Sequence, residues 1–300
     1  MLRLGLRLAL LTVAYLACFV MANGIAVQPY LPANDAALVA QQQATGAALA
    51  MVAVSFLNSA VIATLILQAK SSGWRLSAAV FLILYGSMTF MAQIETAAFP
   101  AVANRLPPGM LGGMFMMGLL LAGPYSLLAV WILGKWKTTE NEPRMPLPPA
   151  REWAWKLPVI AVLYAGLYFT FGYYVAWRNP DVLTYYGGTD PGSLWLQLQH
   201  VARTTPWLPF FQLLRGALWV AIALPMIRQM KAPVWKIALA VGLSYAVLMN
   251  SQHLFANPYM PDAVRFTHLL ETASSNFLFG VLAVFILFWP TSRHRAAIAP

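Results

Sequence analysis

Charged residues are scarce in this chain. Only 9% of its 300 residues are Asp, Glu, Lys or Arg, while 60% are hydrophobic, and a soluble domain usually carries about 25% charged residues. The apolar residues fall in runs of about 20, the length that a helix needs to cross about 30 Å of hydrocarbon. The runs are continuous rather than alternating, so they predict helices and not barrel strands. The composition excludes a soluble domain and predicts a polytopic membrane protein.

Cysteine is almost absent, and several motifs are missing. The single cysteine, Cys18, excludes a disulfide within the chain and a thiolate metal cluster. The sequence has no phosphate-binding P-loop, no GxSxG, no HExxH and no DxxxD-type prenyl site. It also has no histidine pairs at mid-bilayer that could hold two haems. These absences argue against an ATP-driven pump, the enzyme classes that depend on those motifs, and a cytochrome.

Eight apolar runs predict an all-α bundle of eight transmembrane spans. A charged, Pro-rich segment at 135–156 is expected to be a cytoplasmic linker. It separates the first four spans, within 1–134, from the last four, within 157–300, and all eight form one integrated membrane domain. The first run also resembles a secretory signal peptide, but its length favours a retained span. The predicted spans are 5–27, 46–68, 76–98, 110–134, 157–177, 206–229, 235–254 and 264–290.

Basic residues are distributed unevenly between the loops. If the N-terminus is cytoplasmic, most of the 19 Lys and Arg residues lie on the cytoplasmic side. This bias predicts that both termini are cytoplasmic. The net charge of +10 is therefore interpreted as a topology signal and a contact with anionic lipid, not as a nucleic-acid surface. The exceptions, in outer loops or the outer half of the membrane, are Arg105, Arg178, Arg203, Arg215 and Arg265.

The longest outer loop, residues 178–205, contains turn signals and a short amphipathic stretch. "SLWLQLQHVA" predicts an interfacial helix capped by Ser193. Two interpretations remain open for this loop. It is either a packed surface connection or a lid over a pocket that opens outward.

Several polar residues lie inside the spans, and the topology places them at similar depth. Glu95 is about 28 Å from the inner edge of its span at 1.5 Å per residue, which puts it near the outer boundary. Arg215, Glu271, His253 and His268 also fall in the outer half. Charged groups inside a membrane are costly unless they are paired or hydrated, so they usually face the bundle interior.

The last span carries a polar face. His268, Glu271, Thr272 and Ser275 follow the spacing i, i+3, i+4 and i+7, which brings them to one side of a helix. Leu270 and Phe277 are expected to face lipid, and Asn276 and Gly280 to allow close helix approach. Further polar groups are Ser55, Asn58 and Ser59 on the second span and Gln212, Arg215 and Gly216 on the sixth.

The third span is less regular. Gly86, Thr89, Gln93 and Thr96 share one face, but Glu95 points well away from Gln93. Either the helix is unwound near Pro100, or Glu95 serves a different neighbour.

Four interpretations of the polar residues remain open. Arg215 could simply neutralise one or both glutamates and fix helix packing. The outer half could instead hold a pocket for a small solute or lipid headgroup, with a site made of Glu95, Arg215, His268, Glu271, Thr272 and Ser275. The third is a divalent-metal site from His253, His268, Glu271 and Glu95. The fourth is acid–base catalysis by Glu271 and His268 on a lipid-borne substrate.

The sequence thus predicts a multi-pass protein of the bacterial inner (plasma) membrane that binds a small solute or headgroup, for transport or sensing. The alternatives are an enzyme, with a divalent metal as its candidate cofactor, acting at the outer face, and an accessory subunit of a membrane complex. The expected partners are the lipid bilayer, the solute or headgroup, and a membrane-protein partner or a second copy of the chain, but no nucleic acid.

Overall fold

A computed structural model describes residues 2–31, 45–137, 148–256 and 259–289. These residues form helices and turns, and their only β feature is an isolated bridge between Ala69 and Met230. Eight of the helical segments are long and apolar enough to cross a membrane. The expected all-α bundle of eight spans is confirmed. The spans are Leu2–Tyr30, Gly46–Leu67, Gly73–Ala98, Met110–Ile132, Ala150–Arg178, Leu208–Ile227, Val234–Leu254 and Asp262–Leu287.

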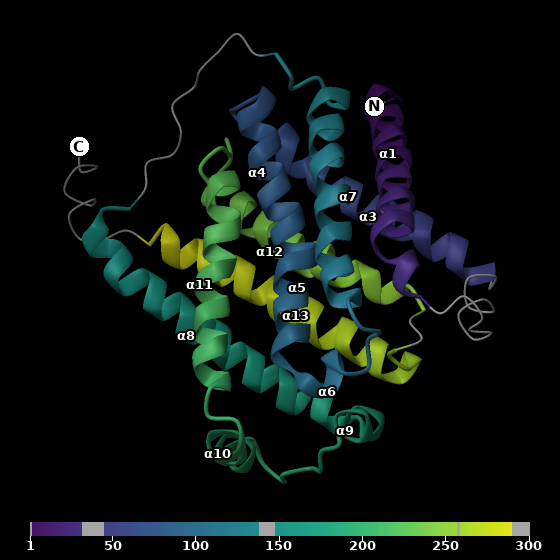
Figure 1. Ribbon diagram of the computed structural model, residues 1–300. Coiled ribbons are helices and arrows are strands. Elements are labelled where there is room, and N and C mark those ends of the chain that lie inside the picture. Colours follow the sequence, from purple (N-terminus) through teal and green to yellow (C-terminus); the bar gives the residue numbers. More distant parts are fainter. Residues whose placement is uncertain (1, 32–44, 138–147, 257–258, 290–300) are drawn as a thin grey trace.

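The helices follow in the order of the labels in Figure 1. The π-turn η2 joins α4 to α5 within the third span, and α9 and α10 lie outside the spans. The 3-10 turns are η1 (Gln28–Tyr30), η3 (Ala176–Arg178) and η4 (Ser251–Leu254). The other elements are α1 (Leu2–Ala26), α3 (Thr45–Leu67), α4 (Gly73–Tyr85), η2 (Gly86–Phe90), α5 (Met91–Ala98), α6 (Pro100–Ala103), α7 (Met110–Ile132), α8 (Ala150–Tyr174), α9 (Pro180–Tyr186), α10 (Leu194–Thr204), α11 (Leu208–Ile227), α12 (Val234–Asn250) and α13 (Asp262–Leu287).

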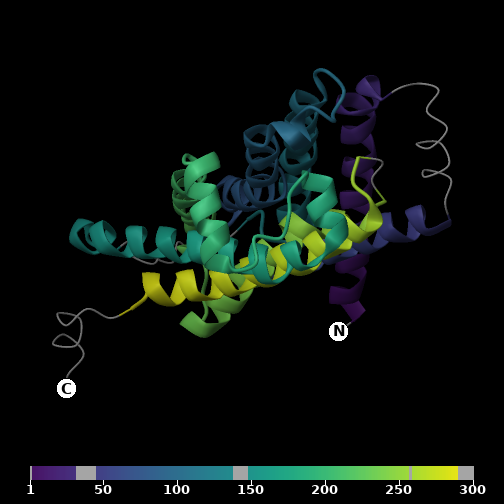
Figure 2. The same ribbon diagram turned by 90° about the horizontal axis from the view of Figure 1, so that it is seen from below.

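The spans pack in two layers. In Figure 1, α1, α7, α4–α5 and α11 run side by side, while α3, α12, α13 and α8 cross obliquely behind them, and Figure 2 shows the two layers from below. Neighbours within each layer are in contact, and α1 with α3 and α8 with α11 join the layers at their edges. The spans therefore form a flattened closed ring.

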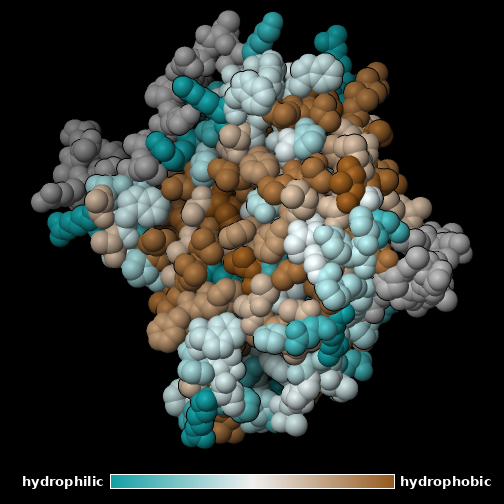
Figure 3. Space-filling model, viewed as in Figure 1, coloured by the Kyte–Doolittle hydropathy of each residue, from teal (hydrophilic) through white to brown (hydrophobic). Residues whose placement is uncertain are grey.

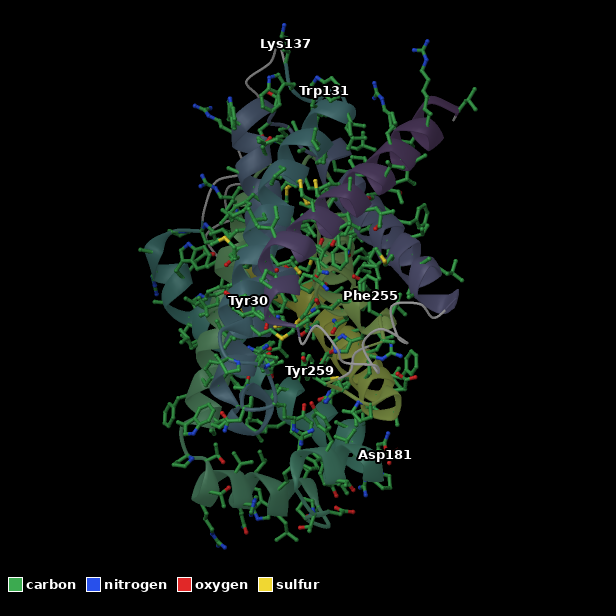
Figure 4. All side chains as sticks on the ribbon, turned by 45° about the vertical axis from the view of Figure 1, so that its right-hand side comes forward. Tyr30, Trp131, Lys137, Asp181, Phe255 and Tyr259 are labelled. Carbon is green, nitrogen blue, oxygen red and sulfur yellow. The ribbon has the colours of Figure 1, made fainter. Side chains whose placement is uncertain are left out.

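The loops expected on the cytoplasmic side meet at one end of the bundle. The backbone N–H of Lys70 donates to the Gln229 carbonyl (2.6 Å) and that of Lys231 to the Gln68 carbonyl (2.7 Å). Lys137 lies at this end and Asp181 at the other (Figure 4). Hydrophobic surface is concentrated between the two ends (Figure 3). The arrangement is that of a bundle crossing a bilayer.

The loop at the other end forms two short helices. Helix α10 is the interfacial helix that the sequence predicted, because the Ser193 hydroxyl accepts from the Leu196 N–H (3.2 Å) and Trp195 is exposed. Helix α9 is capped by Asn179, whose side chain also donates to the Thr267 hydroxyl (2.7 Å). These bonds hold α9 against the outer end of α13.

The predicted linker at 135–156 is shorter than expected. Helix α8 begins at Ala150, so residues 150–156 are helical, while residues 138–147 lie outside the described part. The buried Lys156 explains the early start. Its ammonium pairs with Glu152 (2.6 Å) and donates to the Leu287 carbonyl (2.8 Å) at the C-terminal end of α13. A cation is favourable there because of the helix dipole.

Small residues allow a close helix contact between α12 and α13. A Cβ on Gly280 would lie 2.8 Å from the Cα of Gly242. The Asn276 side chain donates to the Met249 sulfur (3.2 Å) beside this contact. The expected close approach at Asn276 and Gly280 is confirmed. One consequence corrects a prediction: Phe277 is half-buried against Gly242 instead of facing lipid, whereas Leu270 is 66% exposed as expected.

The polar residues of the second span pair within the core. Asn58 donates to the Tyr15 hydroxyl (2.8 Å) and accepts from Ser251 (3.0 Å). Ser59 accepts from the Tyr125 hydroxyl (2.8 Å). Most of these groups satisfy one another, so they join helices without forming a site.

Candidate binding site

A small polar cavity lies between five spans, in the half of the bundle that the sequence predicts to be the outer one. Its volume is about 20 Å³, and one water needs about 10–15 Å³. The cavity in this conformation therefore holds one occupant of about the size of water. It is lined by Glu271, Thr272, Ser275 and Asn276 of α13, Tyr164, Leu167 and Tyr168 of α8, Glu95 of α5, Arg215 of α11 and Met249 of α12.

Helical spacing explains the two longest walls. On α13, Glu271 and Ser275 are four residues apart, as are Thr272 and Asn276, so all four face the same side. On α8, residues 164, 167 and 168 follow i, i+3 and i+4. Gly172 of α8 lies beside Glu271, and a Cβ there would be in ordinary contact with Oε1 at 3.6 Å.

Arg215 is paired with Glu95. The guanidinium Nη2 lies 2.7 Å from Oε2 of Glu95 and also donates to the Met91 carbonyl (3.2 Å), while Nη1 donates to Gln212 (3.0 Å). The arginine side chain is 1% exposed and that of Glu95 26%. The pair removes most of the cost of burying the charge. Of the three guanidinium nitrogens of Arg215, Nε is the one without a partner in the described part of the chain.

The pairing with Arg215 explains why Glu95 points away from Gln93 on the third span. Helix α5 is regular at Glu95, whose carbonyl accepts from the Phe99 N–H (3.2 Å). Glu95 therefore points away from Gln93 because it faces α11, not because the helix is unwound. The sequence offered no signal for the π-turn before it, where the Met91 N–H bonds to the Gly86 carbonyl.

Glu271 belongs to a chain of hydrogen bonds that begins outside the membrane spans. Its Oε2 lies 2.8 Å from Nδ1 of His268, and Nε2 of that ring lies 3.0 Å from the Tyr186 hydroxyl on α9. Burial raises the pKa of Tyr186, and the nearby Glu95 and Glu271 raise it further. The phenol therefore stays protonated and can donate.

Two protonation patterns satisfy this chain. In one, Tyr186 donates to Nε2, and a neutral His268 donates from Nδ1 to Glu271. In the other, an imidazolium donates to both partners. Both ring nitrogens are engaged in either pattern, so His268 does not activate a serine or threonine hydroxyl as a general base. The interpretation of Glu271 and His268 as acid–base catalysts on a lipid-borne substrate stays a prediction.

The hydroxyl groups on α13 use their hydrogens inside the helix bundle. Thr272 donates to Asn250 of α12 or to the His268 carbonyl, and Ser275 donates to the Thr272 carbonyl (3.3 Å). A hydroxyl has one hydrogen and two acceptor lone pairs. Both oxygens therefore keep acceptor capacity toward the cavity.

The four candidate metal ligands do not come together. No three His, Cys, Asp or Glu side chains within the described ranges are grouped closely enough to hold a metal ion. The Glu95 carboxylate is taken by Arg215. His253 does not line the cavity, and its Nδ1 lies 3.2 Å from the Asn250 carbonyl. The structure therefore does not assemble the metal site that the sequence suggested from His253, His268, Glu271 and Glu95.

The structure gathers most of the candidate site residues. Glu95, Arg215, Glu271, Thr272 and Ser275 line one cavity, and His268 stands behind Glu271. Sequence reasoning missed three tyrosines. Two of them, Tyr164 and Tyr168, follow helical spacing within the fifth span and could have been found by it. The third, Tyr186, lies in a loop helix without a recognisable signal.

Comparison of the chain with family models, with curated proteins and with solved structures gave no match. The proposal for its function therefore depends on the site alone.

Proposed function

We propose that this chain is a multi-pass protein of the bacterial inner membrane that binds a small polar solute in the outer-half cavity, for transport or sensing. The observation that carries the proposal is the convergence of Glu95, Arg215 and Glu271 from three helices on one cavity. Ionisable groups within a membrane are costly, and in transport and sensing proteins they line the ligand site.

Helix packing alone accounts for only part of this arrangement. The ion pair of Arg215 and Glu95 satisfies both partners and could serve to join α5 and α11. Glu271 has no arginine partner: its Oε2 lies 2.8 Å from Nδ1 of His268, and its side chain lines the cavity. A carboxylate oxygen that faces a cavity, beside two hydroxyls, is the arrangement of a binding site.

The enclosure of the cavity favours a small solute over a lipid headgroup. The space is close to that needed by one water, and α9 is held against α13 beside it by the bond from Asn179 to Thr267. Binding of a larger solute requires α8 and α13 to separate.

The proposal can be tested by ligand-dependent thermal unfolding of the purified protein in detergent. The panel comprises sodium, potassium and ammonium chloride, potassium phosphate, glycine and a neutral sugar. We expect at least one solute to raise the unfolding midpoint of the wild type, with a smaller rise in Glu271→Gln and Ser275→Ala.

Ser274→Ala provides a matched control. Ser274 is the neighbour of Ser275 on α13 and also bonds to a helix carbonyl, that of Leu270 (2.5 Å), but it does not line the cavity. The proposal is wrong if no solute shifts the midpoint, or if every shift survives in Glu271→Gln and Ser275→Ala as it does in Ser274→Ala.

A further inference from the structure

We infer that the ligand of this cavity is a small monovalent cation, held by Glu271 and the oxygen atoms of α13. The inference rests on the proposed function and names the class of solute. Sodium and a small ammonium ion are both monovalent cations that bind to oxygen atoms, and the experiment below distinguishes them.

The charges around the cavity disfavour an anion. Arg215 is the one arginine in the lining, and Glu95 lies 2.7 Å from it as a charge partner. With the Glu271 carboxylate ionised, Glu271 and His268 together carry a charge of about −1 when the imidazole is neutral and about 0 when it is protonated. With both carboxylates ionised, the site therefore carries no net positive charge to attract an anion. The neutral pattern leaves one negative charge, which a single positive charge would balance.

The atoms that face the cavity from α13 are acceptors. The Glu271 side chain is 10% exposed, and its contact with His268 runs through Oε2, not Oε1. The oxygens of Thr272 and Ser275 keep free lone pairs, and the hydrogen bond of Asn276 to Met249 uses its amide nitrogen, not its oxygen. Hard cations bind to carboxylate, hydroxyl and amide oxygens of this kind. The set lies within one and a half turns of a single helix, so it is present before the ligand arrives.

The charge and volume of the site favour a monovalent ion. A divalent ion is usually held by several carboxylates, whereas here Glu95 is paired with Arg215 and Glu271 is the one carboxylate of the lining without an arginine partner. A cavity of about 20 Å³ suits one desolvated ion or one ammonium group. The ring of Tyr168 in the wall adds a surface that an ammonium can face.

One observation weighs against a purely acceptor-lined site. Nε of Arg215 is a buried donor without a partner in the described part of the chain. Nε2 of Gln212, whose oxygen accepts from Arg215, is a second such donor, but Gln212 does not line the cavity, whereas four residues of α13 with acceptor oxygens do. The balance of groups still favours a cation.

The test uses the full chain in detergent, with N-methyl-D-glucamine chloride as the reference salt. Sodium, potassium or ammonium chloride replaces it at constant ionic strength and pH, and the thermal unfolding midpoint is measured against concentration. We expect a saturable rise with sodium or ammonium, and the ion that gives the rise identifies the source. Glu271→Gln should raise the apparent Kd by about tenfold or more, because the ligand loses its charge partner.

Two variants guard against a folding defect in Glu271→Gln. Ser275→Ala keeps the carboxylate and should raise the apparent Kd by a smaller factor, whereas Ser274→Ala should bind as the wild type does. The inference of a cation is overturned if sodium, potassium and ammonium all behave as the reference salt. If phosphate, glycine or a sugar then stabilises the protein in a Glu271-dependent way, the cavity binds another class of solute. If nothing does, the proposed function fails as well.

Discussion

At the scale of single residues, the buried charges are the most demanding feature of this protein. Arg215 is 1% exposed and depends on Glu95 for charge and on Gln212 and the Met91 carbonyl for hydrogen bonds. Removing one member of a buried ion pair costs about 3–5 kcal/mol, because the other charge stays buried. Replacing both members costs far less.

We therefore predict that Glu95→Gln lowers the free energy of unfolding by about 3–5 kcal/mol, and that adding Arg215→Gln to it recovers most of the loss. Chemical unfolding in detergent measures the free energy of unfolding of the single variant and of the double variant. Asp190→Asn is the control, because Asp190 pairs with Arg178 at 3.7 Å with both side chains about half exposed, and such pairs contribute at most about 1 kcal/mol. Equal losses in Glu95→Gln and Asp190→Asn would contradict the account.

The sequence predicted the candidate residues better than their partners. The spacing of 268, 271, 272 and 275 placed them on one face, and the loop charges placed that face level with Arg215. Which carboxylate faces the arginine could not be deduced, because it depends on the rotation of three helices about their axes. The structure assigns Arg215 to Glu95 and leaves Glu271 with His268.

At the scale of helices, the site depends on how closely α12 and α13 pack. Gly280 lies against the backbone of Gly242, so a larger residue at either position would require one of the two helices to move. The contact lies about one turn along α13 from Asn276 in the cavity wall. A shift of α13 there would displace the binding oxygens.

We predict that Gly280→Ala destabilises the protein by about 1–3 kcal/mol through overpacking. Its added Cβ would lie 2.8 Å from backbone. Gly166→Ala, within α8 and open to space around its Cβ, should be neutral or stabilise by up to about 1 kcal/mol. Thermal unfolding of the two variants, one at a time, gives the comparison. A Gly280→Ala protein as stable as Gly166→Ala would show that the contact is looser than described.

Helix existence followed from apolar run length, but helix detail did not. The eight spans appear where the sequence predicts them, because crossing hydrocarbon requires about 20 apolar residues. The start of α8 at Ala150 was missed because its first two turns are polar in sequence. Only the structure shows that Lys156 in these turns donates to the C-terminal end of α13. The π-turn at Gly86–Phe90 has no local signal, since it depends on packing against neighbouring spans.

At the scale of the whole molecule, the bundle has two distinct ends. One carries the bridge between Ala69 and Met230, and the other carries α9 and α10 (Figure 1). The bias of basic residues predicts that the first end is cytoplasmic. In this orientation the cavity lies in the half of the bundle nearer the outer face.

Cysteine labelling in intact cells tests this orientation. The chain's one cysteine, Cys18, is buried, so an introduced cysteine can be observed against a low background. We predict that Thr189→Cys, exposed at the outer end, reacts with a membrane-impermeant maleimide. Lys137→Cys, exposed at the other end, should react only after the membrane is permeabilised. The reverse pattern would invert the topology and place the cavity in the inner half.

The central claim is that the space between α5, α8, α11 and α13 is a binding site whose free ligand group is Glu271. An experimental density map of the protein in sodium chloride, at a resolution that shows ordered waters, tests it most directly. The account predicts density for one occupant in contact with Oε1 of Glu271 and at least one α13 hydroxyl, with Arg215 on Glu95. A map in which Glu271 is paired with Arg215, or in which apolar side chains fill the space, would contradict it.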